Sequence, residues 1–169
     1  VGELEGYVAK KYIFETEEDG EWYLLSTSTT KAGANTNRDI NINIASSYIN
    51  GKILQPNEKF SFWDTVGKCT YDKGYKDATV YNNGKKTKGI GGGVCQVSTT
   101  VNMAVKSAGI KTNARQHSLP VSYASREDEA TVSFGNIDFK FTNTTGKTIM
   151  LVMGAVDGSC TCEVWAKYE

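Results

Sequence analysis

The sequence predicts an α+β fold, in which an antiparallel or mixed β-sheet packs with two main helices. Two stretches with helical periodicity lie around residues 37–50 and 94–108. Strand-like stretches dominate from residue 110 onward, and a hairpin turn is expected at residues 157–159. Early helices followed by neighbouring antiparallel strands are typical of the α+β class.

The composition limits the classes of function. The chain has 169 residues, which is enough for one well-filled core. Its 19 basic and 19 acidic residues give a net charge of zero, so it carries no electrostatic signature of a nucleic-acid or anionic-membrane partner. We expect residues 1–30 to form an N-terminal β-hairpin or extension and residues 31–169 to form the main domain.

In the first third of the chain, residues 4–28 read as a hairpin around the polar turn at residues 17–21. Residues 27–38 hold few large apolar side chains and read as a connection or groove wall. A helix is predicted over residues 37–50, capped by Asn37, because apolar residues recur there at helical spacing. Asn41 and Asn43 fall on its outer side and are expected to be solvated.

In the middle of the chain, residues 60–63 alternate as a half-buried strand would. Turn signals at residues 72–74 and 82–84 flank a short predicted strand at residues 78–81. The second turn leads into a run of glycines, either as a loop that delivers the chain into a site or as a solvated lysine-rich hairpin tip. We favour the hairpin tip.

The run of glycines before Cys95 is the clearest chemical signal. Gly91, Gly92 and Gly93 precede a predicted helix, which places Cys95 on its first turn, where unpaired N–H groups and the helix dipole favour a thiolate. Cys95 also lies off the apolar stripe of this helix, which ends at Gly109. These features favour a reactive cysteine over a structural one.

His117, the single histidine of the chain, is the candidate partner of Cys95. On a strand following the helix, this imidazole could return across the helix N-terminus to act as a general base. Arg115, two residues away, would point to the same side of that strand and could bind a carboxylate. The alternative is that both are ordinary surface or hydrogen-bonded residues.

The remaining cysteines indicate no metal site or cofactor. Cys160 and Cys162 share one face of the last predicted strand, too far apart for an unstrained disulfide, and either could pair with Cys69. A metal site built from Cys95, His117 and this pair would lack compact ligand spacing. Nucleotide and serine-hydrolase motifs are also missing from the sequence.

Several motifs together resemble the VanW domain family, named after an accessory protein of a glycopeptide-resistance cluster. The similarity covers roughly residue 26 to the C-terminus. The motifs are NRDINI at residues 37–42, PNEKFSFWDTVG at 56–67, Gly74 and Tyr75 followed by Ala78, GIGGGVCQVSTT at 89–100, RQHS at 115–118 and ATV at 130–132. Two positions depart from the family pattern: Glu129 stands where an aspartate is usual, and Asn57 where a glycine is usual.

The resemblance implies a catalytic domain over residues 31–169 that forms 3-3 peptidoglycan cross-links as an L,D-transpeptidase. Cys95 would attack the third residue of a donor stem peptide and form a thioester, with His117 as general base and acid. The oxyanion would be bound by backbone N–H groups of Gly92, Gly93 and Val94. Substrate contacts would come from Arg115, Gln96, Ser98 and Tyr123.

The same resemblance places the protein outside the cell, at the bacterial envelope, with peptidoglycan stem peptides as its partners. We expect a monomer, a membrane anchor or further domains beyond this segment, and neither nucleic acid nor cofactor. Two alternatives stay open. One is a noncatalytic module that binds peptidoglycan or a partner protein, and the other is a cysteine amidase or peptidase that hydrolyses the same stems.

Overall fold

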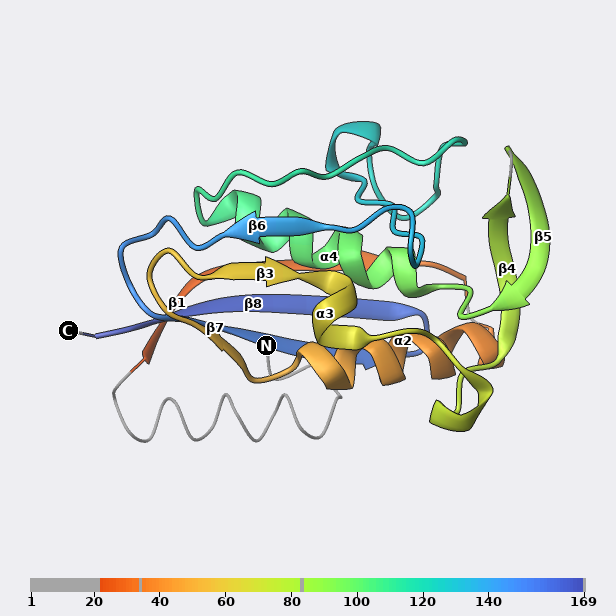
Figure 1. The fold of residues 1–169 in the computed structure, drawn as a ribbon, viewed down its shortest axis with the longest axis horizontal. Helices are drawn as coiled ribbons and strands as arrows, with labels where there is room; N and C mark the ends of the chain where they lie inside the picture. The colour runs from red at the N-terminus through yellow and green to blue at the C-terminus, as the bar shows by residue number, and fades with distance from the viewer. Residues whose placement is uncertain (1–21, 34, 83, 169) are drawn as a thin grey trace.

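The computed structural model describes residues 22–33, 35–82 and 84–168 (Figure 1). The helices are α2 (Thr36–Ile49), α3 (Phe62–Val66) and α4 (Val94–Ser107), with 3-10 turns η1 (Tyr71–Lys73) and η2 (Arg126–Asp128). The strands are β1 (Trp22–Lys31), β2 (Lys52–Leu54), β3 (Lys59–Ser61), β4 (Asp77–Asn82), β5 (Lys85–Ile90), β6 (Lys140–Thr142), β7 (Ile149–Val156) and β8 (Ser159–Lys167).

The main sheet is antiparallel and has the strand order β1-β8-β7-β2. Side chains alternate across it, so that one face of β8 joins the main core and the other face carries Trp165 beside Met150 and Val152. The residues of β8 on the core face are Cys160, Cys162, Val164 and Ala166, as the alternation of the sequence predicts.

Helices α2 and α4 pack on the same face of this sheet. Helix α2 contacts β7, whereas α4 lies against β1 and β8, and the two helices touch each other. Ile42, Ala45 and Ile49 of α2 and Val97 and Val101 of α4 are fully buried between helices and sheet. The predicted α+β class with two main helices is therefore confirmed.

Strands β3 and β6 form a separate ribbon whose inner residues Phe60 and Phe141 complete the same core. The strand expected at residues 60–63 is wrong in its second half, because Phe62 begins α3. The Ser61 side chain accepts a hydrogen bond from the Asp64 N–H and caps that helix. A good N-cap residue in the middle of the aromatic run thus ends the strand.

The connection expected at residues 27–38 is largely strand and helix. Strand β1 continues to Lys31 and pairs with β8 on both sides of an irregularity at Leu25. Helix α2 is capped by Asn35 rather than Asn37. The hairpin turn expected at residues 17–21 lies outside the described residues. The described part of the expected N-terminal unit belongs to β1, at the edge of the main sheet.

After α4 the chain is less regular than predicted. The stretches containing Thr112 and Ser133 contribute only isolated bridges, and His117 lies in an irregular segment rather than a strand. Backbone groups of this irregular segment form hydrogen bonds with side chains instead of with a neighbouring strand. For example, the His117 backbone N–H donates to the Glu129 carboxylate. Backbone groups satisfied in this way do not need a neighbouring strand.

At one end of the molecule β4 and β5 form the expected hairpin, which stands apart from the main sheet (Figure 1). Its Lys85, Lys86 and Lys88 are exposed, as expected of a lysine-rich hairpin. Within the described residues, no helix has the length and apolar character needed to cross a bilayer.

Asn41, expected to be solvated, is instead fully buried. Its side-chain N–H2 donates to the carbonyl oxygens of Lys76 (2.9 Å) and Gly92 (2.8 Å), and its oxygen accepts from the Lys76 N–H (2.8 Å). One amide side chain therefore ties α2 to the chain just before β4 and to the glycine run before α4.

We predict that Asn41→Ala lowers the free energy of unfolding by about 2–4 kcal/mol, because it leaves three buried backbone groups without this partner. Chemical denaturation monitored by circular dichroism measures the change. Asn43→Ala is the matched control, since Asn43 is an exposed asparagine on the same helix, and it should change stability by less than about 0.5 kcal/mol. Equal effects of the two substitutions would contradict this role of Asn41.

Candidate active site

The glycine run forms a tight turn that delivers the chain into α4. Gly91 and Gly93 have positive φ angles of 81° and 110°, and Gly93 is the N-cap of the helix. Position 92 requires glycine for a steric reason, because a Cβ atom there would stand 2.5 Å from the Thr79 carbonyl oxygen. The turn therefore depends on glycine, and it places Cys95 on the first turn of α4.

The Cys95 thiol is half-buried and faces the chain around Val132. Its Sγ atom lies 3.5 Å from the Val132 N–H nitrogen, 3.4 Å from the Val132 carbonyl oxygen and 3.8 Å from Thr131 Oγ1. The Val132 N–H can donate to the sulfur, and such a bond favours the thiolate form.

His117 is 3% exposed and lies close enough to Cys95 for the two side chains to shift each other's pKa. Its Nδ1 atom is 2.8 Å from Oε1 of Glu129, and its backbone N–H donates to the same oxygen over 2.7 Å. With Nδ1–H directed at the carboxylate, Nε2 is left to exchange a proton with the thiol. Cys95, His117 and Glu129 thus form a linked series that could serve as nucleophile, base and orienting acid.

Arg126 neutralises the buried Glu129 carboxylate. Its Nη1 atom lies 3.3 and 3.2 Å from the two oxygens of Glu129, and its Nη2 atom donates to the His117 carbonyl oxygen over 3.0 Å. A buried charge is costly unless it is paired and hydrogen-bonded. This arginine therefore gives the buried carboxylate a charged partner beneath the imidazole.

Cys95 and His117 shift each other's pKa. Burial alone would raise the pKa of the Cys95 thiol, but the hydrogen bond and charge of His117, with bonds from Val132 and Thr131, outweigh burial and lower it. Burial alone would lower the pKa of His117, yet bonds and charges from Cys95 and Glu129 raise it. Both shifts favour the thiolate and imidazolium forms relative to the isolated side chains.

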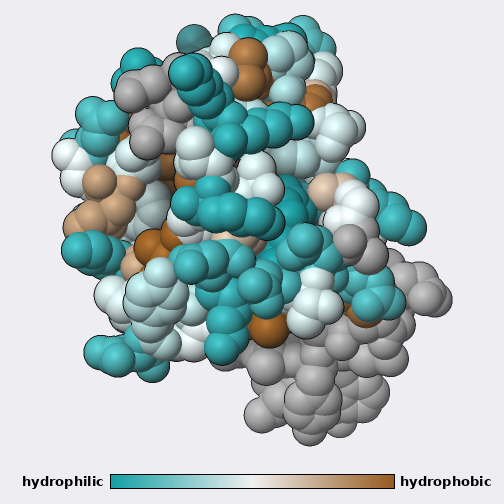
Figure 2. Space-filling model, turned by 90° about the vertical axis from the view of Figure 1, so that its right-hand side faces the viewer, coloured by the Kyte–Doolittle hydropathy of each residue, from teal (hydrophilic) through white to brown (hydrophobic). Residues whose placement is uncertain are grey.

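Two tyrosines flank the imidazole. The Tyr81 ring of β4 lies edge-on at 5.7 Å, and the Tyr123 ring lies at 6.4 Å with its hydroxyl 3.5 Å from His117 Nε2. The end of the molecule that carries the β4–β5 hairpin faces the viewer in Figure 2, and its surface is mainly hydrophilic. Such a surface suits a polar substrate better than a lipid.

Gln96 and Ser98, expected to contact substrate, are fully buried. The Gln96 side chain bonds to Arg38, to Thr30 Oγ1 and to the Gly158 carbonyl oxygen, while the Ser98 hydroxyl donates to carbonyl oxygens within the protein. Their placement contradicts the expected substrate contacts. Both residues instead hold α4 in position.

The predicted oxyanion-binding groups are only partly available. The Val94 N–H donates to the Gly91 carbonyl oxygen over 3.3 Å, so this amide already has an acceptor. The backbone of Gly92 and Gly93 lies directly before it, at the positive end of α4. These two residues stay candidates for the role.

Arg115 is exposed, and its carbonyl oxygen accepts from the Thr131 N–H. A different arginine lies at the site. Arg38 of α2 is half-buried, donates to Gln96 Oε1, and places its guanidinium 5.6 Å from the centre of the Tyr123 ring. Its Cγ atom stands 2.8 Å from where a Gly93 Cβ would be, next to the turn before Cys95.

All four cysteines are free thiols, so the suggested pairing of Cys69 with Cys160 or Cys162 is not formed. Cys160 and Cys162 are enclosed in the core, and burial raises the pKa of Cys160 to about 11. Cys69 packs against Gly91. Among the residues that the structure describes, no group of three His, Cys, Asp or Glu side chains is placed to hold a metal ion.

Sequence reasoning missed the roles of Glu129, Arg126 and Tyr81. The position of Glu129 directly before the ATV motif was the signal for the first of these. No periodicity pointed to Arg126 or Tyr81, because the irregular loop and the hairpin that carry them reach the site only in the folded chain.

We predict that alkylation of Cys95 by iodoacetamide depends on this network. The alkylation rate rises with pH as the thiolate forms, so the midpoint of the rate plotted against pH reports the pKa of Cys95. His117→Ala should move this midpoint upward by about one pH unit or more, because the lowered pKa of Cys95 relies on the imidazolium. Glu129→Gln should give a smaller upward shift. Glu127→Gln, at an exposed neighbouring acid, should leave the midpoint in place, and an unmoved midpoint in His117→Ala would refute the pairing.

Comparison with known proteins gives the chain its family. The family model described as "VanW like protein" matches residues 37–165. The chain is 39% identical over 145 residues to "Uncharacterized protein YoaR" of Bacillus subtilis (strain 168), a match covering 85% of this chain and 46% of that protein. It is 30% identical over 142 residues to "Vancomycin B-type resistance protein VanW" of Enterococcus faecalis (strain ATCC 700802 / V583), covering 79% of this chain and 46% of that protein.

The chain thus spans about half the length of these curated relatives. No solved structure matches it at a significant level. The family match includes Cys95, His117 and Glu129 together with the glycine turn that positions the thiol. The chain belongs to the VanW-like protein family.

Proposed function

We propose that this protein is a cysteine acyltransferase of the bacterial cell envelope, an L,D-transpeptidase that forms 3-3 cross-links between peptidoglycan stem peptides. The observation that carries the proposal is the Cys95 thiol at the start of α4, whose pKa is lowered by a neighbouring imidazole that a buried carboxylate orients. A relative named for vancomycin resistance supports a role at the cell wall.

The first half-reaction would acylate the enzyme. The Cys95 thiolate attacks the carbonyl carbon of the third residue of the donor stem, and backbone N–H groups of Gly92 and Gly93 bind the resulting oxyanion. The C–N bond to the terminal D-alanine then breaks as the His117 imidazolium gives its proton to the leaving amine. The product is a thioester with a neutral imidazole beside it.

The second half-reaction would release the enzyme. A side-chain amine of an acceptor stem attacks the thioester carbonyl, passes a proton to His117, and expels the Cys95 thiolate. Glu129 holds the imidazole in one orientation through both proton transfers and never reacts itself. If water replaced the amine, the same thioester would give a free tripeptide, which is the amidase or peptidase alternative.

Arg38 is the best-placed cation for a carboxylate of the donor. It is anchored by Gln96 and stacked near Tyr123, so its guanidinium is oriented before substrate binds. Arg115, the sequence-based candidate, is exposed on the irregular segment before His117. We therefore assign binding of the terminal D-alanine carboxylate to Arg38.

We predict that Cys95→Ala abolishes cross-linked dimers when purified tetrapeptide muropeptides are incubated with the protein and analysed by mass spectrometry. Cys69→Ala is the matched control, because it removes the other half-buried thiol and should leave dimers in place. Circular dichroism checks that both variants fold. Dimers formed by Cys95→Ala would rule out the thioester, and free tripeptide in place of dimers would assign hydrolysis.

For the second prediction, Arg38→Gln should raise KM for a tetrapeptide donor by about tenfold or more, because it removes a hydrogen bond to a charged group. The same variant should bind a donor with an amidated C-terminus no worse than wild type does. Arg115→Gln should change the KM for the tetrapeptide donor and the KM for the amidated donor by no more than about twofold. An equal loss for both donors would mean that Arg38 acts only by holding the site together.

A further inference from the structure

A second polar surface lies on the β3–β6 ribbon, away from the β4–β5 hairpin (Figure 1). In the register of this ribbon, Lys59 faces Thr142 and Ser61 faces Lys140, while Phe60 faces Phe141 between them. Side chains alternate across a strand, so the two phenylalanines point into the core and the four polar residues point outward. On the outer face of the ribbon, Lys59 and Lys140 therefore lie on opposite strands, diagonally across from each other.

Residues beside the ribbon extend this face. Thr112 bridges to Phe141 and turns its hydroxyl inward to Asn102 of α4, which leaves the neighbouring Lys111 exposed. Asn113 accepts from the backbone N–H of Lys140 and fixes this edge. Lys52 of β2 adds a fourth ammonium group on the other side.

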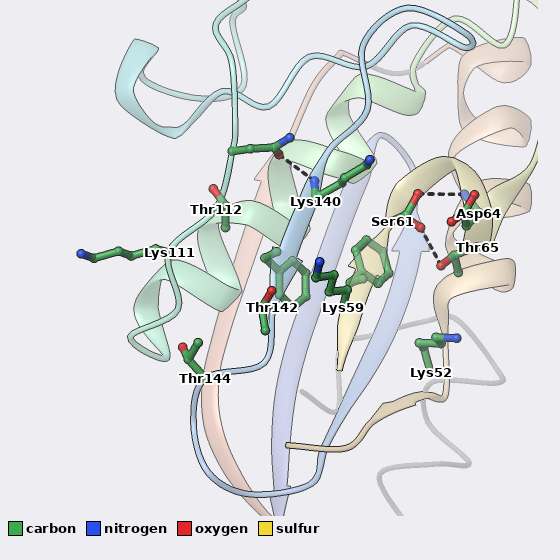
Figure 3. A pocket seen from close by; sticks show the side chains of 13 residues that line it. Lys52, Lys59, Ser61, Asp64, Thr65, Lys111, Thr112, Lys140, Thr142 and Thr144 are labelled. Carbon is green, nitrogen blue, oxygen red and sulfur yellow. Dashed lines mark hydrogen bonds between the residues drawn. The ribbon is translucent and has the colours of Figure 1, made fainter. Parts of the chain in front are cut away.

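These residues surround an open groove of about 810 Å³ (Figure 3). Lys59 lies near its middle, and Lys111 and Lys52 lie toward opposite sides. Asp64 is its single acidic lining residue. In the described part of the chain, none of the four lysines is bound in a salt bridge. The zero net charge of the whole chain hides this local excess of positive charge.

The lining of the groove indicates the kind of ligand. Lysines are compact point charges that suit phosphate groups, whereas planar carboxylates are usually gripped by arginine, which the lining lacks. The two aromatic rings of the floor are at most 4% exposed, so bases or sugar rings could not stack on them. Threonine hydroxyls between the lysines offer further hydrogen bonds.

We infer that this groove binds a linear polymer of phosphodiesters that carries no bases, such as a poly(glycerol phosphate) chain. Several ammonium groups spaced along one groove match repeated phosphates along a flexible chain, and each contact releases counterions. Such binding would hold the protein to an anionic polymer while the site at the start of α4 stays free. The inference does not depend on the proposed reaction.

The test measures binding of a fluorescently labelled synthetic poly(glycerol phosphate) of about twelve units by anisotropy. The double variant Lys59→Ala/Lys140→Ala should weaken binding about tenfold or more, as expected for the loss of two cationic contacts. Lys85→Ala/Lys88→Ala removes two exposed lysines from β5 and should bind as wild type does. The affinity of wild type should fall with salt, with a logarithmic slope of about −0.7 for each lysine engaged.

Cys95→Ala should bind the polymer as wild type does. The binding measurement can therefore be interpreted even if the protein shows no transpeptidase activity. Three outcomes would overturn the inference. The groove variant could bind as tightly as wild type, or the β5 variant could lose as much affinity. Alternatively, an oligothymidylate or a polyglutamate with the same number of charges could bind as tightly as the glycerol phosphate polymer.

Discussion

The buried hydrogen bond between Glu129 and His117 is the interaction on which the site depends. A carboxylate with almost no exposure is stable there only because three donors converge on it: the imidazole, a backbone N–H and the Arg126 guanidinium. Together they fix which ring nitrogen faces the carboxylate. That choice leaves the other nitrogen for the Cys95 thiol. Burial opposes a charged imidazole, but Cys95 and then Glu129 outweigh burial and raise the pKa of His117.

The Cys95 thiol is positioned by a separate set of constraints. Close approach of the Gly92 backbone to β4, positive φ at Gly91 and Gly93, and the three hydrogen bonds of Asn41 hold the turn before α4. The helix carries the thiol, while an irregular loop from the other side carries the imidazole and the carboxylate. The site is therefore assembled from two halves that meet at the N-terminus of α4, and the packing of both halves on the same core keeps them in register.

The sequence was a good guide wherever residue spacing carries the signal. Periodicity and the glycine run predicted α4 with Cys95 on its first turn, and alternation predicted the inward face of β8. It was a poor guide to buried polar residues. Asn41 and Gln96 are typical surface residues by type, and each is buried because the folded chain supplies partners for every polar atom of its side chain.

The pairing of His117 with Glu129 was beyond the reach of such patterns for a related reason. The two residues are 12 positions apart in a segment with neither helical nor strand periodicity. Their contact is set by tertiary structure, through a carboxylate that satisfies a backbone N–H and a ring nitrogen together. Likewise, the arginine beside Tyr123 and the turn before Cys95 comes from α2, about 57 positions before the thiol in the chain, rather than from the neighbourhood of His117.

The most direct test of the central claim, that Cys95 is an ionised nucleophile activated by His117, is the intact mass of the protein after incubation with a carbapenem. Opening of the β-lactam ring would leave the whole drug attached to the attacking sulfur. The wild-type protein should gain the mass of one drug molecule, and Cys95→Ala should gain none. A wild-type protein that stays unmodified, or an equal adduct on Cys95→Ala, would contradict the claim.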